Sequence, residues 1–206
     1  MICIPIKKKT VTGVLHTLTK TKEADLVEIW FDELNSLSEQ NIKLIFKSAK
    51  KPILYKSSGD LKKIEQVLAS GPKFIDLDVS TKKATIKKIK TLSPKTQIIL
   101  SHHDFKRTPT TKELKKIVSQ MTNKGADINK IATFANSLAD SLRVLELLTE
   151  QKIPAIFICM GKYGEITRTT GHLFGNYLTY APLSEKDKTA PGQVVLKKLI
   201  EIRKLI

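Results

Sequence analysis

The sequence has few of the features that mark secreted, membrane-spanning or metal-binding proteins. It contains only two cysteines among 206 residues, Cys3 and Cys159, which lie far apart and lack the close spacing of a metal site. No apolar stretch is long enough to cross a bilayer, and the N-terminal segment MICIPIKKKT has its apolar residues before its basic ones, the reverse of a secretory signal. We therefore expect reduced cysteines in a cytoplasmic protein, with no membrane association and no metal.

Acidic residues and arginines are scarce beside lysine. The chain has 36 Lys and Arg against 20 Asp and Glu, which gives a formal net charge of +16, and its arginines are Arg107, Arg143, Arg168 and Arg203. Such a balance can indicate nucleic-acid binding, but no basic strand interleaved with aromatic residues accompanies it. We expect no nucleic-acid partner, and we interpret the lysines as solvent-exposed charges that help to attract a small anionic substrate.

Short apolar runs are plentiful and recur along the whole chain. Eight of them are rich in Ile, Val, Leu and Phe, as buried parallel strands are. They span residues 2–6, 24–31, 51–56, 73–79, 97–103, 128–134, 154–160 and 176–182.

Amphipathic helical patterns separate many of these runs. They cover residues 37–50, 58–70, 108–125, 136–151 and 190–206. Ser38 is a capping signal for the first, Gly125 is a stop signal for the third, and Pro191 is expected in the first turn of the last.

Strands that alternate with helices eight times predict a single (β/α)8 TIM barrel over residues 1–206. The alternative, an open doubly wound sheet, would have fewer strands and usually a glycine-rich turn after the first one. The segment IPIKKKT has no such turn.

A barrel places functional groups at the carboxyl ends of its strands, so polar residues in or just after the apolar runs are the candidates. They are Glu28, Asp32, Lys56, Asp60, Asp76, Asp78, His102, His103, Lys130, Arg168 and Gln193.

Lys130 lies in the apolar run INKIATF. If its side chain points into the barrel, burial lowers the pKa of the amine, and an uncharged amine attacks carbonyl groups to form an imine. The alternative is a lysine that faces the exterior at the end of the strand.

The two adjacent histidines lie at the end of the fifth run. Successive side chains of a strand point to opposite faces, so only one of His102 and His103 can enter the barrel. That one suits proton transfer, because the pKa of histidine lies near neutrality. Metal ligation is not expected, since adjacent side chains on one strand diverge.

Two carboxylates, Glu28 and Asp76, fall within apolar strands and need partners. They either orient the histidine and bind substrate hydroxyls, or form an internal pair with a lysine such as Lys56.

Four segments, taken together, resemble type I 3-dehydroquinate dehydratases. They are SHHDF with the following TP, DINKIA, the block from Met160 to Gln193 with MG, Arg168 and FG, and its final APGQ. VEIWFDEL, KPILYK and IDLD extend the resemblance over essentially the whole chain.

The resemblance implies a cofactor-independent Schiff-base hydro-lyase of the shikimate pathway, in a family that is commonly homodimeric. Lys130 would form an imine with the C3 ketone of 3-dehydroquinate. His103 would remove the C2 proton and then protonate the departing C1 hydroxyl. Asp76 would hold His103, Glu28 would bind substrate hydroxyls, and Arg168 would clamp the carboxylate with two parallel hydrogen bonds.

The remaining implied residues include departures from the family pattern. Gln193 would close the site as a lid, and Thr189 replaces the usual serine with its hydroxyl retained. Trp30 replaces a substrate-facing arginine, Lys56 replaces another arginine, and Asp60 replaces a glutamate expected to orient groups of the site. Weaker substrate binding, by about 1.5–3 kcal/mol, is expected from one lost charge-assisted hydrogen bond.

Three alternatives stay open from the sequence. The chain is another lysine-dependent barrel lyase, such as an aldolase acting on a sugar phosphate, or a family member whose substrate preference is changed by Trp30 and Lys56. The third is a non-catalytic, nucleic-acid-associated barrel.

Overall fold

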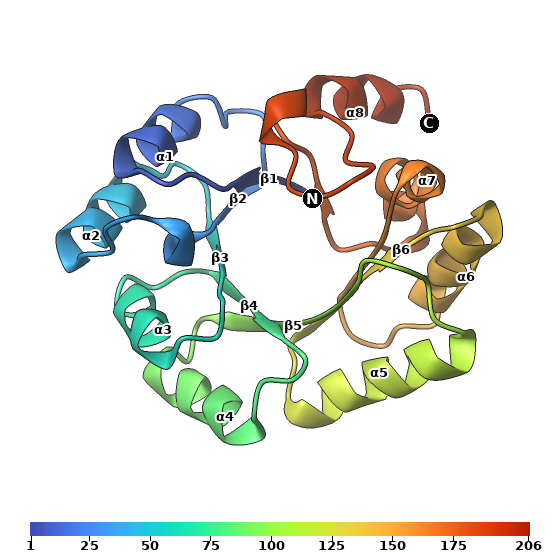
Figure 1. The fold of residues 1–206 in the computed structure, drawn as a ribbon, viewed down its shortest axis with the longest axis horizontal. Coiled ribbons are helices and arrows are strands. Elements are labelled where there is room, and N and C mark those ends of the chain that lie inside the picture. The colour runs from blue at the N-terminus through green and yellow to red at the C-terminus, as the bar shows by residue number, and fades with distance from the viewer.

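The computed structural model describes residues 1–206 and has a ring of eight parallel strands surrounded by helices (Figure 1). The strands are β1 (Ile2–Ile6), β2 (Leu26–Ile29), β3 (Ile53–Lys56), β4 (Phe74–Asp78), β5 (Gln97–Asp104), β6 (Ile128–Phe134), β7 (Ala155–Met160) and β8 (Thr179–Tyr180). Their order around the sheet is β7-β6-β5-β4-β3-β2-β1-β8, so β1 pairs in parallel with both β2 and β8. This sequential order is that of the predicted (β/α)8 barrel, and the doubly wound alternative is wrong.

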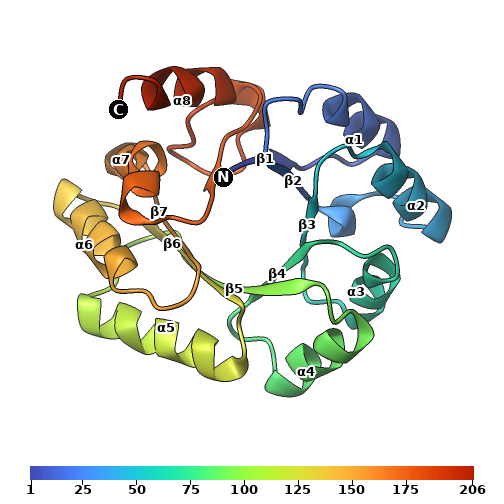
Figure 2. The same cartoon turned by 180° about the vertical axis from the view of Figure 1, so that it is seen from behind.

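The helices lie outside the ring, as the view from behind also shows (Figure 2). They are α1 (Val11–Leu18), α2 (Glu39–Ser48), α3 (Leu61–Leu68), α4 (Lys83–Leu92), α5 (Thr111–Lys124), α6 (Leu138–Thr149), α7 (Glu165–Thr169) and α8 (Leu196–Arg203). Short 3-10 turns are η1 (Phe31–Glu33), η2 (Lys162–Gly164), η3 (Gly171–Phe174) and η4 (Glu185–Asp187). No helix is long and apolar enough to span a membrane.

Local sequence signals explain several helix ends. The Ser38 side chain accepts a hydrogen bond from the backbone of Asn41 at the start of α2. At the start of α5, Thr110 and Glu113 form a reciprocal capping box, and Gly125 ends this helix in the left-handed conformation with φ 97°. Pro191, however, precedes α8 by several residues and belongs to the loop after β8, so its predicted place in the first turn is wrong.

The barrel closes between β7 and β8 without a regular ladder. The backbone N–H of Tyr177 donates to the carbonyl of Ala155 over 2.8 Å, and the side chain of Asn176 accepts from the backbone of Phe157 over 2.9 Å. The eighth strand pairs with β1 only through Thr179 and Tyr180, so it is two residues long rather than the predicted 176–182.

The barrel interior has an apolar layer beneath a polar one. On four neighbouring strands an apolar residue that points inward precedes a polar one by two positions. These pairs are Leu54 and Lys56, Phe74 and Asp76, Ile99 and Ser101, and Ile128 and Lys130. The lower layer is a sealed core that includes Cys3, and the upper layer faces the carboxyl ends of the strands. Cys3 and Cys159 are both buried and free.

Candidate active site

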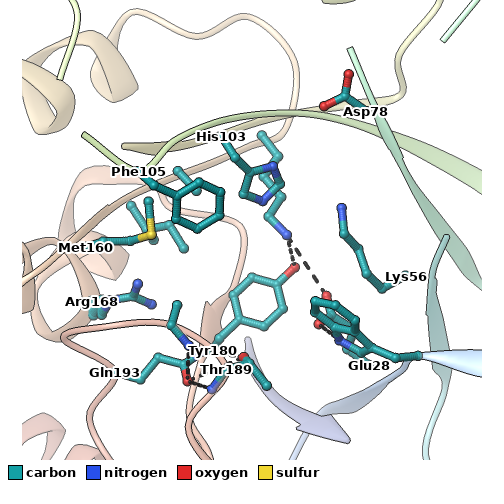
Figure 3. Close-up of a pocket in the computed structure, with 15 residues that line it drawn as sticks. Glu28, Lys56, Asp78, His103, Phe105, Met160, Arg168, Tyr180, Thr189 and Gln193 are labelled. Carbon is teal, nitrogen blue, oxygen red and sulfur yellow. Dashed lines mark hydrogen bonds and ion pairs between the residues drawn. The ribbon is translucent and has the colours of Figure 1, made fainter. Parts of the chain in front are cut away.

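A cavity of about 370 Å³ opens at the carboxyl ends of the strands (Figure 3). Among the predicted site residues, those that line it are Glu28, Lys56, His103, Lys130, Arg168, Thr189 and Gln193. Trp30, Asp78, Phe105, Met160 and Tyr180 contribute further walls. The volume suits a small ring-shaped molecule, and charged side chains lie at both ends of the cavity.

Lys130 points from β6 into the barrel and is only 4% exposed. Its Nζ donates to Oδ2 of Asp76 over 2.6 Å and to the hydroxyl of Tyr180 over 2.8 Å, and Oε2 of Glu28 lies 4.0 Å away. Burial alone would lower the pKa of this amine, but the charges of Asp76 and Glu28 outweigh burial and raise it. The expectation of an uncharged amine in the free protein is therefore wrong, because burial brings the lysine next to carboxylates.

Asp76 is the centre of this charged cluster and is completely buried. Its Oδ1 accepts hydrogen bonds from Nζ of Lys56 over 2.8 Å and from the hydroxyl of Ser101 over 2.6 Å. Burial would raise the pKa of Asp76, but Lys130 and Lys56 hold it well below its usual range. The expected hydrogen bond between Asp76 and His103 is absent, because the two carboxylate oxygens accept from Lys56 and Lys130 instead. The alternative of an internal pair with Lys56 is the arrangement that the structure shows.

Glu28 approaches the same amine from β2 and is 3% exposed. The indole N–H of Trp30 donates to Oε1 over 2.8 Å, whereas Oε2 is buried without a hydrogen-bond partner. Burial raises the pKa of Glu28, and the charge of Lys130 opposes that shift. The free oxygen is thus available to a hydroxyl group of a ligand.

His103 forms the roof of the cavity, and its ring stacks on Phe105 with 6.1 Å between the ring centroids. Burial first, and then the charges of Lys130 and Lys56, lower the pKa of His103 to about 3. The imidazole is consequently neutral at ordinary pH and able to accept a proton. His102 does not line the cavity, as the alternation of β5 predicted.

Arg168, from α7, lies across the cavity from Lys56 and Glu28 (Figure 3). It is 1% exposed, and its Nε donates to the carbonyl of Cys159 over 3.0 Å. Nη1 and Nη2 are buried with no partner. Burial lowers the pKa of Arg168 to about 10, which leaves it charged at neutral pH. A buried, unpaired guanidinium is costly, and a bound anion would remove that cost.

The loop between β8 and α8 covers this end of the cavity. Oε1 of Gln193 accepts hydrogen bonds from the backbone N–H groups of Thr189 and Ala190, and its Nε2 donates to the Thr189 hydroxyl over 3.1 Å. Gly192, with φ 75°, packs on Gly161 so closely that a Cβ there would lie 2.4 Å from the Gly161 oxygen. The loop is thereby fixed over Arg168 and its free N–H groups.

Two further candidates, Asp32 and Asp60, do not line the cavity either. Asp32 accepts hydrogen bonds from the hydroxyl of Tyr55 and from the backbone N–H of Ser58. Asp60 has a different role. It caps α3, where its Oδ1 accepts from the backbone of Lys62 over 2.9 Å and of Lys63 over 3.3 Å. An aspartate at this position is a good helix cap, which the sequence reasoning overlooked.

Sequence reasoning also missed two residues of the charged cluster, Ser101 and Tyr180. Both follow the period of two that placed the other inward residues: Ser101 stands two positions before His103, and Tyr180 stands two positions after the inward-pointing Leu178. That period could have identified them. No group of three or more His, Cys, Asp or Glu side chains is arranged to hold a metal ion.

Comparison with known proteins gives one consistent result. The family model described as Type I 3-dehydroquinase matches residues 2–206. A 3-dehydroquinate dehydratase of Methanocaldococcus jannaschii is 35% identical over 222 residues that cover 100% of this chain and 99% of the relative. Among solved structures, the 3-dehydroquinate dehydratase of Aquifex aeolicus is 26% identical with a TM-score of 0.84, over 100% of this chain and 98% of that one. That of Geobacillus kaustophilus has a TM-score of 0.89 at 24% identity, over 99% and 90%.

Proposed function

Because the chain belongs to the type I 3-dehydroquinase family, we propose that its cavity dehydrates 3-dehydroquinate to 3-dehydroshikimate through an imine on Lys130. The observation that carries this proposal is the pairing of a buried lysine with a buried, unpartnered arginine across one small cavity. The substrate has a ketone for the first and a carboxylate for the second. The enzyme is then a hydro-lyase that needs no cofactor.

Imine formation starts from the ammonium form of Lys130, which carries three protons. As the nitrogen bonds to C3 of the substrate, the carbonyl oxygen leaves as water with two of these protons, and the third stays on the iminium nitrogen. The positive charge therefore remains at Nζ throughout. Asp76 and Glu28, which stabilise the ammonium in the free protein, are placed to stabilise the iminium as well.

Elimination follows from the iminium, which draws electrons from the adjacent C2–H bond. His103 takes the C2 proton, and the electron pair forms an enamine. The enamine then expels the C1 hydroxyl, which takes the same proton from His103 and departs as water. A histidine with a pKa near 3 is a weak base but gives up its proton readily, which suits a poor leaving group. Hydrolysis of the product imine frees Lys130.

The end of the cavity opposite Lys130 would orient the substrate. The two free Nη groups of Arg168 match the two oxygens of the substrate carboxylate, and Thr189 and Gln193 close over them. Glu28 offers a free oxygen to a ring hydroxyl, and Lys56 lies beside it. Since Trp30 occupies a wall where the family has an arginine, we expect weaker binding, by about 1.5–3 kcal/mol.

We also expect a single-domain enzyme that works as a homodimer in the cytoplasm. The family resemblance supports the dimer, and light scattering of the purified protein measures the mass that decides it.

The test is a direct assay of the purified protein on 3-dehydroquinate, followed by the ultraviolet absorbance of the conjugated product. Sugar phosphates serve as comparison substrates, because an aldolase would cleave them. Dehydration of 3-dehydroquinate alone supports the proposal. Turnover of a sugar phosphate with no dehydration, or of a 3-dehydroquinate analogue in preference to 3-dehydroquinate, would overturn it.

A further inference from the structure

Tyr180 contacts the amine of Lys130 in two ways. Its hydroxyl accepts a hydrogen bond from Nζ over 2.8 Å, and the centroid of its ring lies 4.4 Å from the same atom. The residue is 4% exposed, at the end of β8, and it lines the cavity. The tyrosine is therefore fixed beside the position where the carbonyl carbon of a substrate must bond.

The groups around Nζ differ in what they can offer to a substrate. The structure places three polar side chains within 4.0 Å of this atom: Asp76, Glu28 and Tyr180. The pKa of Asp76 is held far down by the two lysines, so it only accepts hydrogen bonds. The pKa of Tyr180 is raised well above its usual value by burial and by the charges of Glu28 and Asp76, so its hydroxyl keeps its proton. Of the three side chains, Tyr180 is thus the one whose hydroxyl carries a proton to donate to a substrate.

We propose that Tyr180 is a catalytic residue that relays a proton from Lys130 to the carbonyl oxygen of the substrate. The oxygen that leaves is attached to the same carbon that Nζ attacks, so a hydroxyl in contact with Nζ is also within reach of that oxygen. In the free protein the hydroxyl of Tyr180 accepts from Nζ, and its own proton interacts with the carboxylate of Glu28. A bound substrate offers its carbonyl oxygen to the same proton.

The relay balances without a tyrosinate. A Nζ–H bond breaks and its proton passes to the oxygen of Tyr180, while the original hydroxyl proton moves to the carbonyl oxygen. The nitrogen lone pair thus freed forms the bond to C3, and the π electrons of the carbonyl become a lone pair on the new C3 hydroxyl. A second transfer along the same path releases that hydroxyl as water and leaves the iminium. The relay explains how an ammonium that is stabilised by carboxylates becomes a nucleophile at neutral pH.

The test compares Y180F, which keeps the ring and removes the hydroxyl, with the control Y177F. Tyr177 precedes β8 and does not line the cavity, so loss of its hydroxyl should not change the trapping rate. The readout is the rate at which borohydride-trapped adduct forms in a rapid-quench experiment. In Y180F this rate should fall by about 10²-fold, the lower end of what a positioned proton-transfer group contributes, while KM changes little.

A second readout separates the relay from a merely structural role. The trapping rate of the wild type and of Y177F should be flat across neutral pH, because the ammonium supplies its own protons through Tyr180. In Y180F the rate should rise with pH, by up to about tenfold per unit, as solvent deprotonates Lys130 instead. Y180F with the rate and pH profile of Y177F would overturn the proposal.

This inference rests on the proposed function, but the two fail differently. A wild type that forms no adduct with 3-dehydroquinate contradicts the function itself, whereas an active wild type with an equally fast Y180F contradicts only the relay. Should Y180F not fold, fluorotyrosine at position 180 retains the side-chain shape and makes the hydroxyl more acidic. An unchanged trapping rate in that variant would also overturn the relay.

Discussion

The cavity contains two buried cations, Lys130 and Arg168, which differ in whether acidic side chains surround them. Lys130 is surrounded by acceptors, with Asp76 at 2.6 Å and a second carboxylate, Glu28, at 4.0 Å. Arg168 is equally buried, yet two of its three guanidinium nitrogens have no partner. The acidic residues of the upper barrel layer thus gather at the lysine end and are missing from the arginine end.

This difference follows from the two proposed roles: Lys130 reacts with the substrate, whereas Arg168 binds its carboxylate. The charge on Lys130 is the same in the ammonium and in the proposed iminium, so permanent carboxylates stabilise both the free protein and the intermediate. A permanent partner for Arg168 would instead compete with the substrate carboxylate. The unsatisfied guanidinium favours binding of an anion at the cost of the stability of the free protein.

The largest expected effect comes from the lysine end. K130M should abolish dehydration, because it removes the amine that is proposed to form the imine, and ultraviolet product assays would measure this. Its free energy of unfolding should fall by about 3 kcal/mol, the lower end for a broken buried pair, since Lys56 still neutralises Asp76. K56M is the matched control and should retain the imine. Activity of K130M within tenfold of the wild type contradicts the role of the lysine.

Between the two cations, H103Q should lower kcat by about 10²–10⁴-fold, as expected for loss of a general acid and base. Borohydride should still trap substrate on Lys130 in this variant, because the imine precedes the histidine's proton transfer. H102Q, whose side chain does not line the cavity, should keep kcat close to wild type. A normal kcat in H103Q would remove the histidine from the mechanism.

At the arginine end, R168M should raise KM by at least about 10²-fold, since charge-assisted hydrogen bonds contribute about 1.5–3 kcal/mol each. The free energy of unfolding of R168M should stay the same or increase, because the variant removes a buried cation that has no counter-ion. The control is R143M, whose arginine pairs with Asp140 at the surface over 2.8 Å. A loss of stability comparable to that of K130M would show that the two cations do not differ as described.

The shifted pKa of His103 gives a smaller effect on stability. In the unfolded chain this histidine takes up a proton below its ordinary pKa of 6.5, whereas the folded protein resists protonation down to about 3. The unfolded state therefore binds more protons in that window, and the wild type loses stability as the pH falls, by up to about 1.4 kcal/mol per unit.

Urea unfolding at neutral and mildly acidic pH measures this slope. H103Q lacks the titrating group and should show a shallower loss, while H102Q should follow the wild type. Equal slopes in H103Q and the wild type would mean that the imidazole is not held neutral by its surroundings.

The smallest effect is expected at Asp60, a carboxylate outside the charged cluster. D60A should reduce the free energy of unfolding by about 1 kcal/mol through loss of the α3 cap and leave kcat/KM unchanged. D60S, which restores a capping oxygen, should recover the stability. If D60A lowers kcat and D60S does not restore it, Asp60 contributes to the active site rather than only to the α3 cap.

Strand periodicity predicted the barrel and much of its site. Alternation on β5 predicted that only one of His102 and His103 enters the barrel, because side-chain direction on a strand is a local property, and the family resemblance selected His103. The apolar run around Lys130 left the direction of that side chain open, and the structure shows it inside the barrel. The eighth strand was predicted too long, since only Thr179 and Tyr180 of that apolar run pair with β1, whereas Asn176 and Tyr177 bond to residues of β7.

The charge state of the site could not be predicted in the same way. Whether Lys130 is neutral or charged depends on Asp76, which is 54 positions away, and on which side chains hydrogen-bond to that carboxylate. The sequence left both options for Asp76 open, and the structure shows it on the lysines. Asp60 was misplaced for the opposite reason: a local capping role was overlooked in favour of a distant one.

The central claim is that Lys130, and not its neighbour on Asp76, becomes the covalent partner of the substrate. It is tested most directly by reducing the wild-type protein with borohydride in the presence of 3-dehydroquinate and mapping the adduct by mass spectrometry of its peptides. The account predicts a single substrate adduct on the peptide that contains Lys130. An adduct on Lys56, or none at all from a protein that dehydrates the substrate, would contradict it.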